Sequence, residues 1–210
     1  MDCPVPWLGT ARLVAWVPTA ADEPAVWAVH SDPDTYRHVP SARLTRHEDA
    51  ARLLSTWMDH WNRYGFGYAT VRSVDDPTVL GFAGAKFAAL SGAEVLNLYY
   101  RFAPRAWGVG YATEIARAVA QWAAAEHPTV PLIARVATNN PPSVRVAERI
   151  GLRDTERTWY DALVQHLPDG AGFADAARAT IAAVADVRPG DAAALDAVRG
   201  AWESVGVRVD

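Results

Sequence analysis

Two glycines stand directly before a long alanine-rich helical pattern, in the sequence Arg105-x-x-Gly108-x-Gly110. An apolar strand pattern ends at Phe102, and the helical pattern runs from about residue 110 to 125. Glycine lets the backbone approach a ligand closely, and the free N–H groups of a helix's first turn bind phosphate. We therefore expect a phosphate or pyrophosphate site and a nucleotide-type cofactor. The Gly-x-Gly pattern by itself is equally consistent with a tight strand-to-helix turn.

A second polar segment begins the next helical pattern. Residues 139–143 read Asn-Asn-Pro-Pro-Ser, which places proline in the first turn of a helix that Gly151 ends. An apolar, β-branched run at residues 131–138 predicts a strand before this segment. The hydroxyl of Ser143 can either cap the helix or donate a proton to a leaving group.

The surrounding patterns predict the elements that position these two segments. We expect a strand, two helices and three strands of an antiparallel meander, at residues 10–17, 22–30, 45–64, 67–73, 79–90 and 94–102. The strand–helix–strand run from residue 95 to 138 predicts a parallel crossover. The expected fold class is therefore α/β, with a mixed antiparallel/parallel central sheet flanked by helices.

Side chains at the expected helix starts predict caps. Asp22 precedes the first helix, and Thr45-Arg46-His47-Glu48 resembles a capping box. Beyond residue 168 the sequence becomes Ala-rich and predicts a C-terminal helical extension, with Asp191 as the cap of its second helix. The remaining expected elements are a strand at 152–160 and helices at about 173–186 and 191–204.

Composition excludes several classes of protein. The chain has 210 residues, a net charge of −4 and no basic block, so we expect no nucleic-acid partner. No apolar run reaches about 18 residues, so we expect no membrane span, and the first residues lack the pattern of a signal peptide. The single cysteine, Cys3, fits a reducing compartment, so the cytoplasm is the expected location. The histidines lack metal-ligand spacing, so we expect no metal site.

Together, the two polar segments resemble the cofactor segments of the GNAT (Gcn5-related N-acetyltransferase) superfamily. The string Tyr100-Arg101-Phe102-Ala103-Pro104, then Trp107-Gly108 and Gly110-Tyr111-Ala112-Thr113-Glu114, is similar to the RimJ/RimL branch. Asn140-x-x-Ser143, Arg145-Val146, Glu148 and Ile150-Gly151-Leu152 resemble the second cofactor segment of that branch. His30-Ser31-Asp32-Pro33 is a third, shorter match. The resemblance covers about residues 8 to 160 and implies a GNAT-like fold with acetyl-CoA as the cofactor.

The resemblance also implies how individual residues bind acetyl-CoA, in a V between the strands at 95–102 and 131–138. Backbone groups near Phe102 and Ala103 would pair with the pantetheine arm as though it were another strand. Backbone N–H groups would hold the pyrophosphate, Arg105 would add charge, and Asn140 would bind the pantetheine region. Ser143 would protonate the leaving thiolate. The implied cofactor-binding residues are Phe102, Ala103, Arg105, Gly108, Val109, Gly110, Tyr111, Ala112, Thr113, Asn140 and Ser143.

The general base is the point at which the sequence departs from the family. The resemblance places Asn97 where many members have a glutamate that relays a proton from the attacking amine. An amide has no basic oxygen at neutral pH, so Asn97 either orients a water or the amine, or is only a polar strand residue. A backbone N–H near Leu98 or Tyr99 would polarise the thioester carbonyl. The catalytic candidates are therefore Ser143 and Asn97.

The resemblance places part of the acceptor pocket between the first two helices, at Tyr36-Arg37-His38-Val39-Pro40. Tyr36 and His38 are therefore candidates for binding the acceptor. Trp57 lies at core spacing on the second helix and is also a candidate wall of the acceptor cleft. The other histidines of this half of the chain are expected to be solvated surface residues: His30, His47 and His60.

These observations predict a GNAT acyltransferase domain at residues 8–165 and a C-terminal helical extension at 166–210. The predicted activity is direct transfer of acetyl from acetyl-CoA to a primary amine, on a protein N-terminus or a small molecule. Because the expected base is missing, the alternative is a non-catalytic or weakly catalytic acyl-CoA-binding module. The apolar stripes of the extension must be buried on the domain or on a partner subunit, so a homodimer is a further hypothesis.

Overall fold

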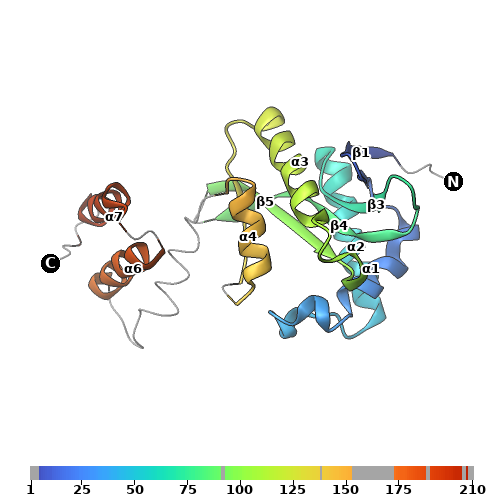
Figure 1. Cartoon of the computed structure of the whole chain (residues 1–210), viewed down its shortest axis with the longest axis horizontal. Coiled ribbons are helices and arrows are strands. Elements are labelled where there is room, and N and C mark those ends of the chain that lie inside the picture. The colour runs from blue at the N-terminus through green and yellow to red at the C-terminus, as the bar shows by residue number, and fades with distance from the viewer. Residues whose placement is uncertain are drawn as a thin grey trace. The chain divides into compact units, whose positions relative to one another are not determined.

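The computed structural model describes residues 5–90, 93–137, 139–152, 173–187, 190–204 and 207. The chain divides into two units, Met1–Leu152 and Arg153–Asp210 (Figure 1). The domain boundary expected near residue 165, and most of the strand expected at 152–160, lie outside the described residues. Each unit is considered by itself below.

The described residues of the first unit form a sheet of six strands whose spatial order is the order of the chain, β1 to β6. Each strand from β1 to β5 pairs antiparallel with the next, whereas β5 and β6 are parallel. The strands are Pro6–Gly9, Leu13–Trp16, Tyr68–Ser73, Val79–Leu90, Ala93–Phe102 and Leu132–Ala134. The predicted mixed sheet is therefore confirmed. Strand β1 was not predicted, and β6 is shorter than its apolar pattern suggested.

Helices cover both faces of this sheet (Figure 1). On one face, side chains of α1 (Glu23–His30) and α2 (His47–Tyr64) pack with Phe82 of β4 in one buried cluster. On the other face, α3 (Tyr111–Glu126) packs against Leu96 and Leu98 of β5. Side chains alternate along a strand, so successive residues of β5 face different helices. This alternation decides which residues of β5 face each side of the site described below.

The helix starts differ from the predicted caps. The Asp22 side chain accepts no hydrogen bond from α1; it pairs with Arg72 at 2.7 Å and accepts from the Thr19 N–H at 2.9 Å. Helix α2 is preceded by Arg46, which makes no side-chain cap, so the predicted capping box at 45–48 is wrong. Glu48 instead pairs with Arg46 at 2.9 Å, because the long guanidinium reaches its carboxylate first.

The described residues of the second unit form two contacting helices, α6 (Phe173–Val187) and α7 (Ala192–Ser204), close to the predicted ranges. Ala177 and Val184, which belong to the predicted apolar stripe of α6, are buried. The Asp191 carboxylate accepts from the Ala194 N–H at 3.0 Å, so this predicted cap is confirmed.

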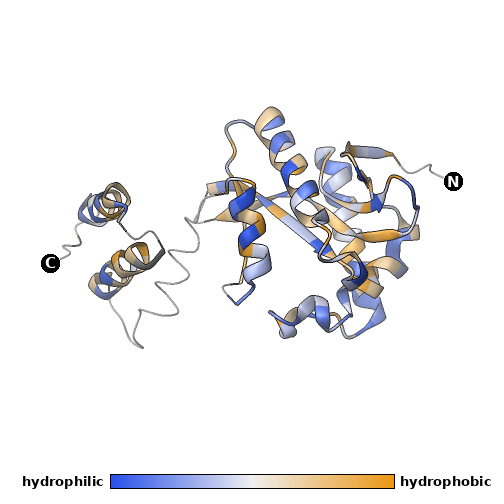
Figure 2. Ribbon diagram, in the orientation of Figure 1, coloured by the Kyte–Doolittle hydropathy of each residue, from blue (hydrophilic) through white to orange (hydrophobic). Residues whose placement is uncertain are grey.

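Hydropathy varies clearly between the helices (Figure 2). Figure 2 shows α4 (Pro141–Arg149) as largely hydrophilic, whereas the strands carry much of the hydrophobic colouring.

Within the described ranges, no helix is both long and apolar enough to cross a membrane. The same part of the chain contains no group of three or more histidine, cysteine or acidic residues placed to hold a metal ion.

Candidate functional site

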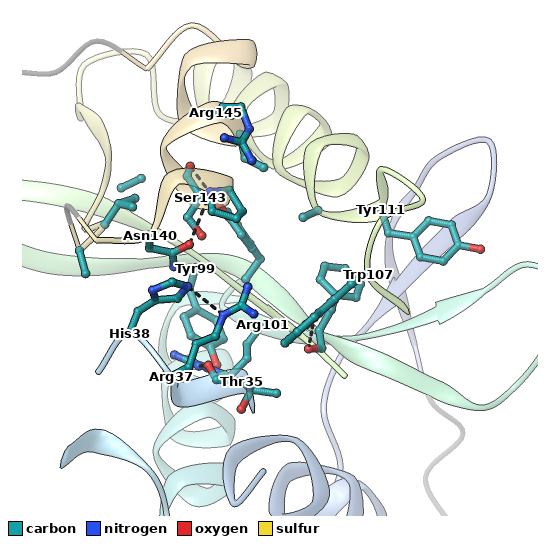
Figure 3. A pocket seen from close by; sticks show the side chains of 18 of the residues that line it. Thr35, Arg37, His38, Tyr99, Arg101, Trp107, Tyr111, Asn140, Ser143 and Arg145 are labelled. Carbon is teal, nitrogen blue, oxygen red and sulfur yellow. Dashed lines mark hydrogen bonds between the residues drawn. The ribbon is translucent and has the colours of Figure 1, made fainter. Parts of the chain in front are cut away.

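A cavity opens where β5 and β6 separate. The two strands pair from Leu96–Leu132 to Leu98–Ala134, and the register ends there. Beyond this point a cavity of about 560 Å³ is lined by the continuation of both strands, the start of α3, one side of α4 and the segment before α2 (Figure 3). The cavity therefore lies in the V that was expected between these strands.

The backbone of β5 offers hydrogen-bonding groups along the edge of this cavity. The Leu96 N–H donates to Pro131 O at 2.8 Å, whereas the Ala103 N–H donates to Leu80 O of the opposite neighbour at 2.9 Å. Because N–H groups alternate along a strand, even-numbered residues face β6 and odd-numbered residues face β4. The Tyr100 backbone and the Phe102 N–H therefore face the open edge, whereas the Phe102 carbonyl already accepts from Trp107 Nε1. The amides of Ala103 and Tyr99 face β4 instead, which contradicts the role expected of Ala103.

The glycine loop after β5 leads directly into α3. Gly108 and Gly110 have φ values of 80° and 87°, in the left-handed region that favours glycine, and Gly110 is the N-cap of α3. The Trp107 Nε1–H donates to Phe102 O at 2.8 Å and holds the loop against the end of β5. The N–H groups of the first turn of α3, from Tyr111 to Thr113, have no intrahelical acceptor. The loop and helix start therefore form an anion-binding end of the cavity.

Arg12 and Glu114 fix this loop from outside the cavity. Glu114 accepts from Thr10 Oγ1 at 2.6 Å, from the Arg12 N–H at 3.0 Å and from Arg12 Nε at 2.7 Å. Arg12 Nη1 also donates to Val109 O at 3.1 Å. Burial raises the pKa of Glu114, but the hydrogen bonds from Thr10 and Arg12 outweigh it, so this pKa lies below its usual range. The hairpin of β1 and β2 thereby holds the loop in place.

The start of α4 contributes hydroxyl and amide groups. Asn140 is the N-cap of α4, and its Oδ1 accepts from the Ser143 N–H at 3.3 Å. Tyr100 Oη donates to the Ser143 carbonyl at 3.3 Å. Burial raises the pKa of Tyr100, partly offset by its hydrogen bond with Ser143, so this phenol stays protonated at neutral pH. Ser143 and Tyr100 together supply proton donors where β5, β6 and α4 meet.

Tyr99, which is half-buried, pairs with the buried His30 on the face of the sheet covered by α1 and α2. His30 is 1% exposed, and its Nε2 lies 2.7 Å from Tyr99 Oη, while Nδ1 lies 2.8 Å from Val26 O. Since a carbonyl only accepts, Nδ1 carries the proton and Tyr99 donates to Nε2. Burial lowers the pKa of His30 to about 4, opposed by the Val26 hydrogen bond and assisted by the Arg101 charge. The pKa of Tyr99 is raised by burial.

Arg101 lies on the same face, two residues further along β5. Its guanidinium stacks over the ring of Tyr36 at 3.7 Å from the centroid, and its Nη1 donates to Thr35 O. Its Nε is buried and has no hydrogen-bond partner among the described residues. Figure 3 shows Arg101 with Thr35, Arg37 and His38 on one side of the cavity, and Ser143 and Arg145 on α4 opposite.

The structure brings most of the predicted site residues together, although not all of them. Tyr36, His38, Phe102, Gly108, Gly110, Tyr111, Ala112, Asn140 and Ser143 line the cavity. Arg105, Val109 and Thr113 do not, and Arg105 instead donates to Val79 O. These three residues belong to the loop and helix start, of which Gly108, Gly110, Tyr111 and Ala112 are the members that line the cavity.

Two further predicted residues lie away from the cavity. Trp57 is 2% exposed and packs among His30, Phe82 and Tyr99, so it belongs to the core and does not wall the cleft. Asn97 donates through Nδ2 to Tyr68 Oη at 2.8 Å and is not among the cavity-lining residues. Trp57 is enclosed by aromatic rings, whereas Asn97 lies on the part of β5 that is still paired with β6, before the cavity opens.

The structure also corrects the expectation for two histidines and adds residues that sequence reasoning missed. His30 and His60 are buried, at 1% and 8% exposure, and each ring forms two hydrogen bonds within the core. The pKa of His60 is likewise lowered, chiefly by burial. The pairing of Arg12 with Glu114 spans 102 residues, so no local spacing could reveal it. Arg101 stood inside the recognised motif, but its stacking partner Tyr36 lies in a distant segment.

A family model and several solved structures relate the chain to the GNAT acetyltransferases. The family model described as "Acetyltransferase (GNAT) domain" matches residues 12–153. The chain is 32% identical over 139 residues to the uncharacterized protein YkkB of Bacillus subtilis (strain 168), covering 61% of this chain and 75% of that protein. A GNAT-family acetyltransferase structure from Bacillus anthracis is 26% identical, with a TM-score of 0.58 over 69% of this chain and 81% of that chain. RimL, a ribosomal L7/L12 α-N-protein acetyltransferase solved with coenzyme A, shares the fold, at 14% identity and a TM-score of 0.56, over 70% of this chain and 82% of that chain.

Proposed function

Because the chain belongs to the family of GNAT acetyltransferase domains, we propose that it transfers an acetyl group from acetyl-CoA to a primary amine by direct attack. The observation that carries this proposal is the joining of a glycine-built anion site, an open strand edge and the Ser143 and Tyr100 hydroxyls in one cavity. RimL, which shares the fold, was solved with coenzyme A.

The residues of the cavity fit acetyl-CoA in three places. The N–H groups at the start of α3 suit a pyrophosphate, with Arg145 and Arg149 of α4 lining the same cavity. The open edge at Tyr100 and Phe102 suits the amide-containing pantetheine arm, which pairs there as an added strand. Ser143 and Asn140 lie where the thioester end would then arrive.

The chain's own residues position the reacting groups and supply the protons. The bound thioester supplies an activated acetyl group. The even-numbered amides of β5 face β6, and the register with β6 ends at Leu98, so Tyr100 offers the first unpaired N–H for the carbonyl oxygen, whereas the Tyr99 amide faces β4. Ser143, whose backbone carbonyl accepts from Tyr100 Oη, donates its hydroxyl proton to the departing thiolate. The amine approaches from the face of β5 that carries Tyr99 and Arg101.

On that face, Tyr99 is the group best placed to accept a hydrogen bond from the N–H of the amine. Its own hydrogen is directed to His30 Nε2 and its oxygen also accepts from Arg101, so one lone pair is left to accept a hydrogen bond from a ligand. Tyr99 therefore orients the amine or a water, the neutral amine attacks the thioester carbonyl as the C–S bond breaks, and the proton that the nitrogen loses passes to solvent water. Asn97, in this proposal, is a polar strand residue bound to Tyr68 rather than a base.

The experiment that tests the proposal is release of free thiol from acetyl-CoA with a panel of primary amines, followed by mass spectrometry of the acetylated product. Acetylation of at least one amine, lost in Ser143→Ala together with Tyr100→Phe, supports the proposal. Arg46→Gln, on the exposed start of α2, is the control variant. Measurable CoA binding without turnover of any amine would instead support the alternative, a non-catalytic acyl-CoA-binding module.

A further inference from the structure

The cavity carries a concentration of positive charge that the rest of the chain does not share. Five arginines line it, with a single carboxylate, Asp34, although the whole chain has a net charge of −4. The arginines are Arg37, Arg101, Arg135, Arg145 and Arg149. No carboxylate of the described residues forms an ion pair with any of them. This positive potential is therefore available to a ligand.

The five arginines belong to two different parts of the cavity. Arg145 and Arg149 lie on α4, and the Arg149 carbonyl accepts from Arg117 of α3 at 3.4 Å, so this part adjoins the phosphate-binding helix. Arg101 extends from β5 on the opposite face, together with Tyr99. The proposed cofactor phosphates account for the first pair of arginines, but not for Arg101.

The guanidinium of Arg101 is fixed by its neighbours, and one of its N–H groups has no acceptor among the described residues. Stacking on Tyr36 and the hydrogen bond to Thr35 O fix its plane. Its Nε nevertheless lacks any hydrogen-bond partner among the described residues. A buried, unsatisfied donor on a charged group is costly, and a planar guanidinium matches a carboxylate or phosphate with two parallel hydrogen bonds.

We propose that Arg101 binds an anionic group of the acceptor, so that the preferred acceptors are amines carrying a carboxylate or phosphate a few bonds from the nitrogen. This inference rests on the proposed acetyl transfer and names its substrate class. Arg37, on the neighbouring segment, adds to the same positive field, and its Nε–H donates to His38 Nε2. Polyamines and other multiply cationic amines are disfavoured, because Asp34 is the only carboxylate lining the described cavity.

The same charge also helps to explain how the reaction proceeds without a glutamate at position 97. A positive environment disfavours the ammonium form and lowers the pKa of a bound amine. More of the acceptor is then present as the neutral amine that attacks the thioester. A carboxylate in place of Asn97 would weaken this effect. Asparagine at this position is therefore consistent with an Arg101 that has no ion-pair partner among the described residues.

The test compares acetylation of matched amines by thiol release from acetyl-CoA. The small-molecule arm pairs β-alanine with β-alaninamide, and O-phosphoethanolamine with ethanolamine. The peptide arm pairs two peptides that differ only by Asp or Asn at the second position, and spermidine is the cationic acceptor. Rates are compared per concentration of neutral amine, because neighbouring groups alter the amine's own pKa.

We expect kcat/KM to favour the anionic member of a pair by about 10- to 100-fold, the usual range for charge-assisted hydrogen bonds. Arg101→Met removes this preference while leaving the KM for acetyl-CoA unchanged, and Arg101→Lys restores part of it through charge alone. Arg46→Met, at an exposed position, is the matched control and leaves both quantities unchanged. The arm with the largest ratio identifies the source of the anionic group.

Two results would overturn the inference while leaving acetyl transfer intact. One is equal or better turnover of the neutral amines or of spermidine. The other is an Arg101→Met variant with a raised KM for acetyl-CoA and an unchanged anionic preference, which would assign Arg101 to the cofactor. Absence of turnover with every amine would contradict the proposed function itself, and the inference with it.

Discussion

The cofactor end and the acceptor end of the cavity are built in different ways. The cofactor end is built from backbone: two glycines with positive φ, the N–H groups of α3 and the open edge of β5. The acceptor end is built from side chains of separate segments: Tyr99 and Arg101 on β5, His30 on α1, and Tyr36 before α2. Backbone sites tolerate changes of side chain, whereas the acceptor end depends on a few individual residues.

This difference has an energetic consequence. At the cofactor end the main cost is the left-handed conformation of the loop, which glycine reduces and which Arg12 and Glu114 hold in place. At the acceptor end the cost is desolvation, because a neutral imidazole and a guanidinium are packed among aromatic rings. Binding at the cofactor end should therefore depend on backbone conformation. Binding at the acceptor end should depend on charge and pH.

The largest expected effect concerns pH and the acceptor end. Burial lowers the pKa of His30 from 6.5 to about 4, so the unfolded chain binds one more proton than the folded chain between these values. The contribution of neutral His30 to the free energy of unfolding is fully present above pH 6.5 and is lost as the pH falls toward 4. The loss is about 3 kcal/mol, at roughly 1.4 kcal/mol per pKa unit. Urea unfolding at a series of pH values measures this loss.

His30→Gln should flatten that pH dependence, since an amide does not titrate in this range. His47→Gln, at a histidine whose side chain is 59% exposed, is the control and should leave the slope unchanged. An identical slope in His30→Gln and the wild type would show that His30 is not the titrating group.

The next effect concerns the cofactor end. Gly110→Val places a β-branched residue at a φ of 87°, which costs about 1–2 kcal/mol or displaces the loop and its donors. We expect the KM for acetyl-CoA to rise by about 30-fold with every amine alike, as expected for loss of one charge-assisted hydrogen bond. Initial-rate kinetics provide the measurement. Gly190→Val, at a φ of 85° in the second unit, carries similar strain and should leave this KM unchanged.

A smaller effect is expected when the loop loses its outside support. Arg12→Gln removes the hydrogen bonds to Val109 O and Glu114, so we expect the KM for acetyl-CoA to rise by about tenfold with kcat unchanged. Arg52→Gln, which removes the exposed pair with Asp49, serves as the control because such pairs contribute little. A fall in kcat with an unchanged KM would contradict the supporting role of Arg12.

The smallest effect is expected at the residue that replaces the family's glutamate. Asn97→Ala should change kcat by less than about threefold, whereas loss of a true general base costs about 10²- to 10⁴-fold. Its Nδ2 is bound to Tyr68 and its Oδ1 has no partner among the described residues, so truncation breaks one side-chain hydrogen bond. A kcat reduced by 100-fold in steady-state assays would return Asn97 to the catalytic site.

The same contrast explains which features could be predicted from the sequence. The glycine loop, α3 and Asn140 are contiguous motifs whose geometry follows from residue type, so the cofactor end could be predicted with the mixed sheet. Strand β1 is only four residues long and carries no alternation, so it could not. The contacts of His30 with Tyr99 and of Arg101 with Tyr36 join segments about 65–70 residues apart, and only tertiary packing creates them.

The most direct test measures initial rates of thiol release in Gly110→Val and in Arg101→Met. The concentration of acetyl-CoA and the concentrations of the matched amines are varied in turn. We predict that Gly110→Val raises the KM for acetyl-CoA and keeps the preference for the anionic amine. We predict the reverse for Arg101→Met, an unchanged KM for acetyl-CoA and a lost preference. Variants that change both quantities in proportion would contradict the separation of the two ends, and absence of thiol release from the wild-type protein would contradict the proposed function.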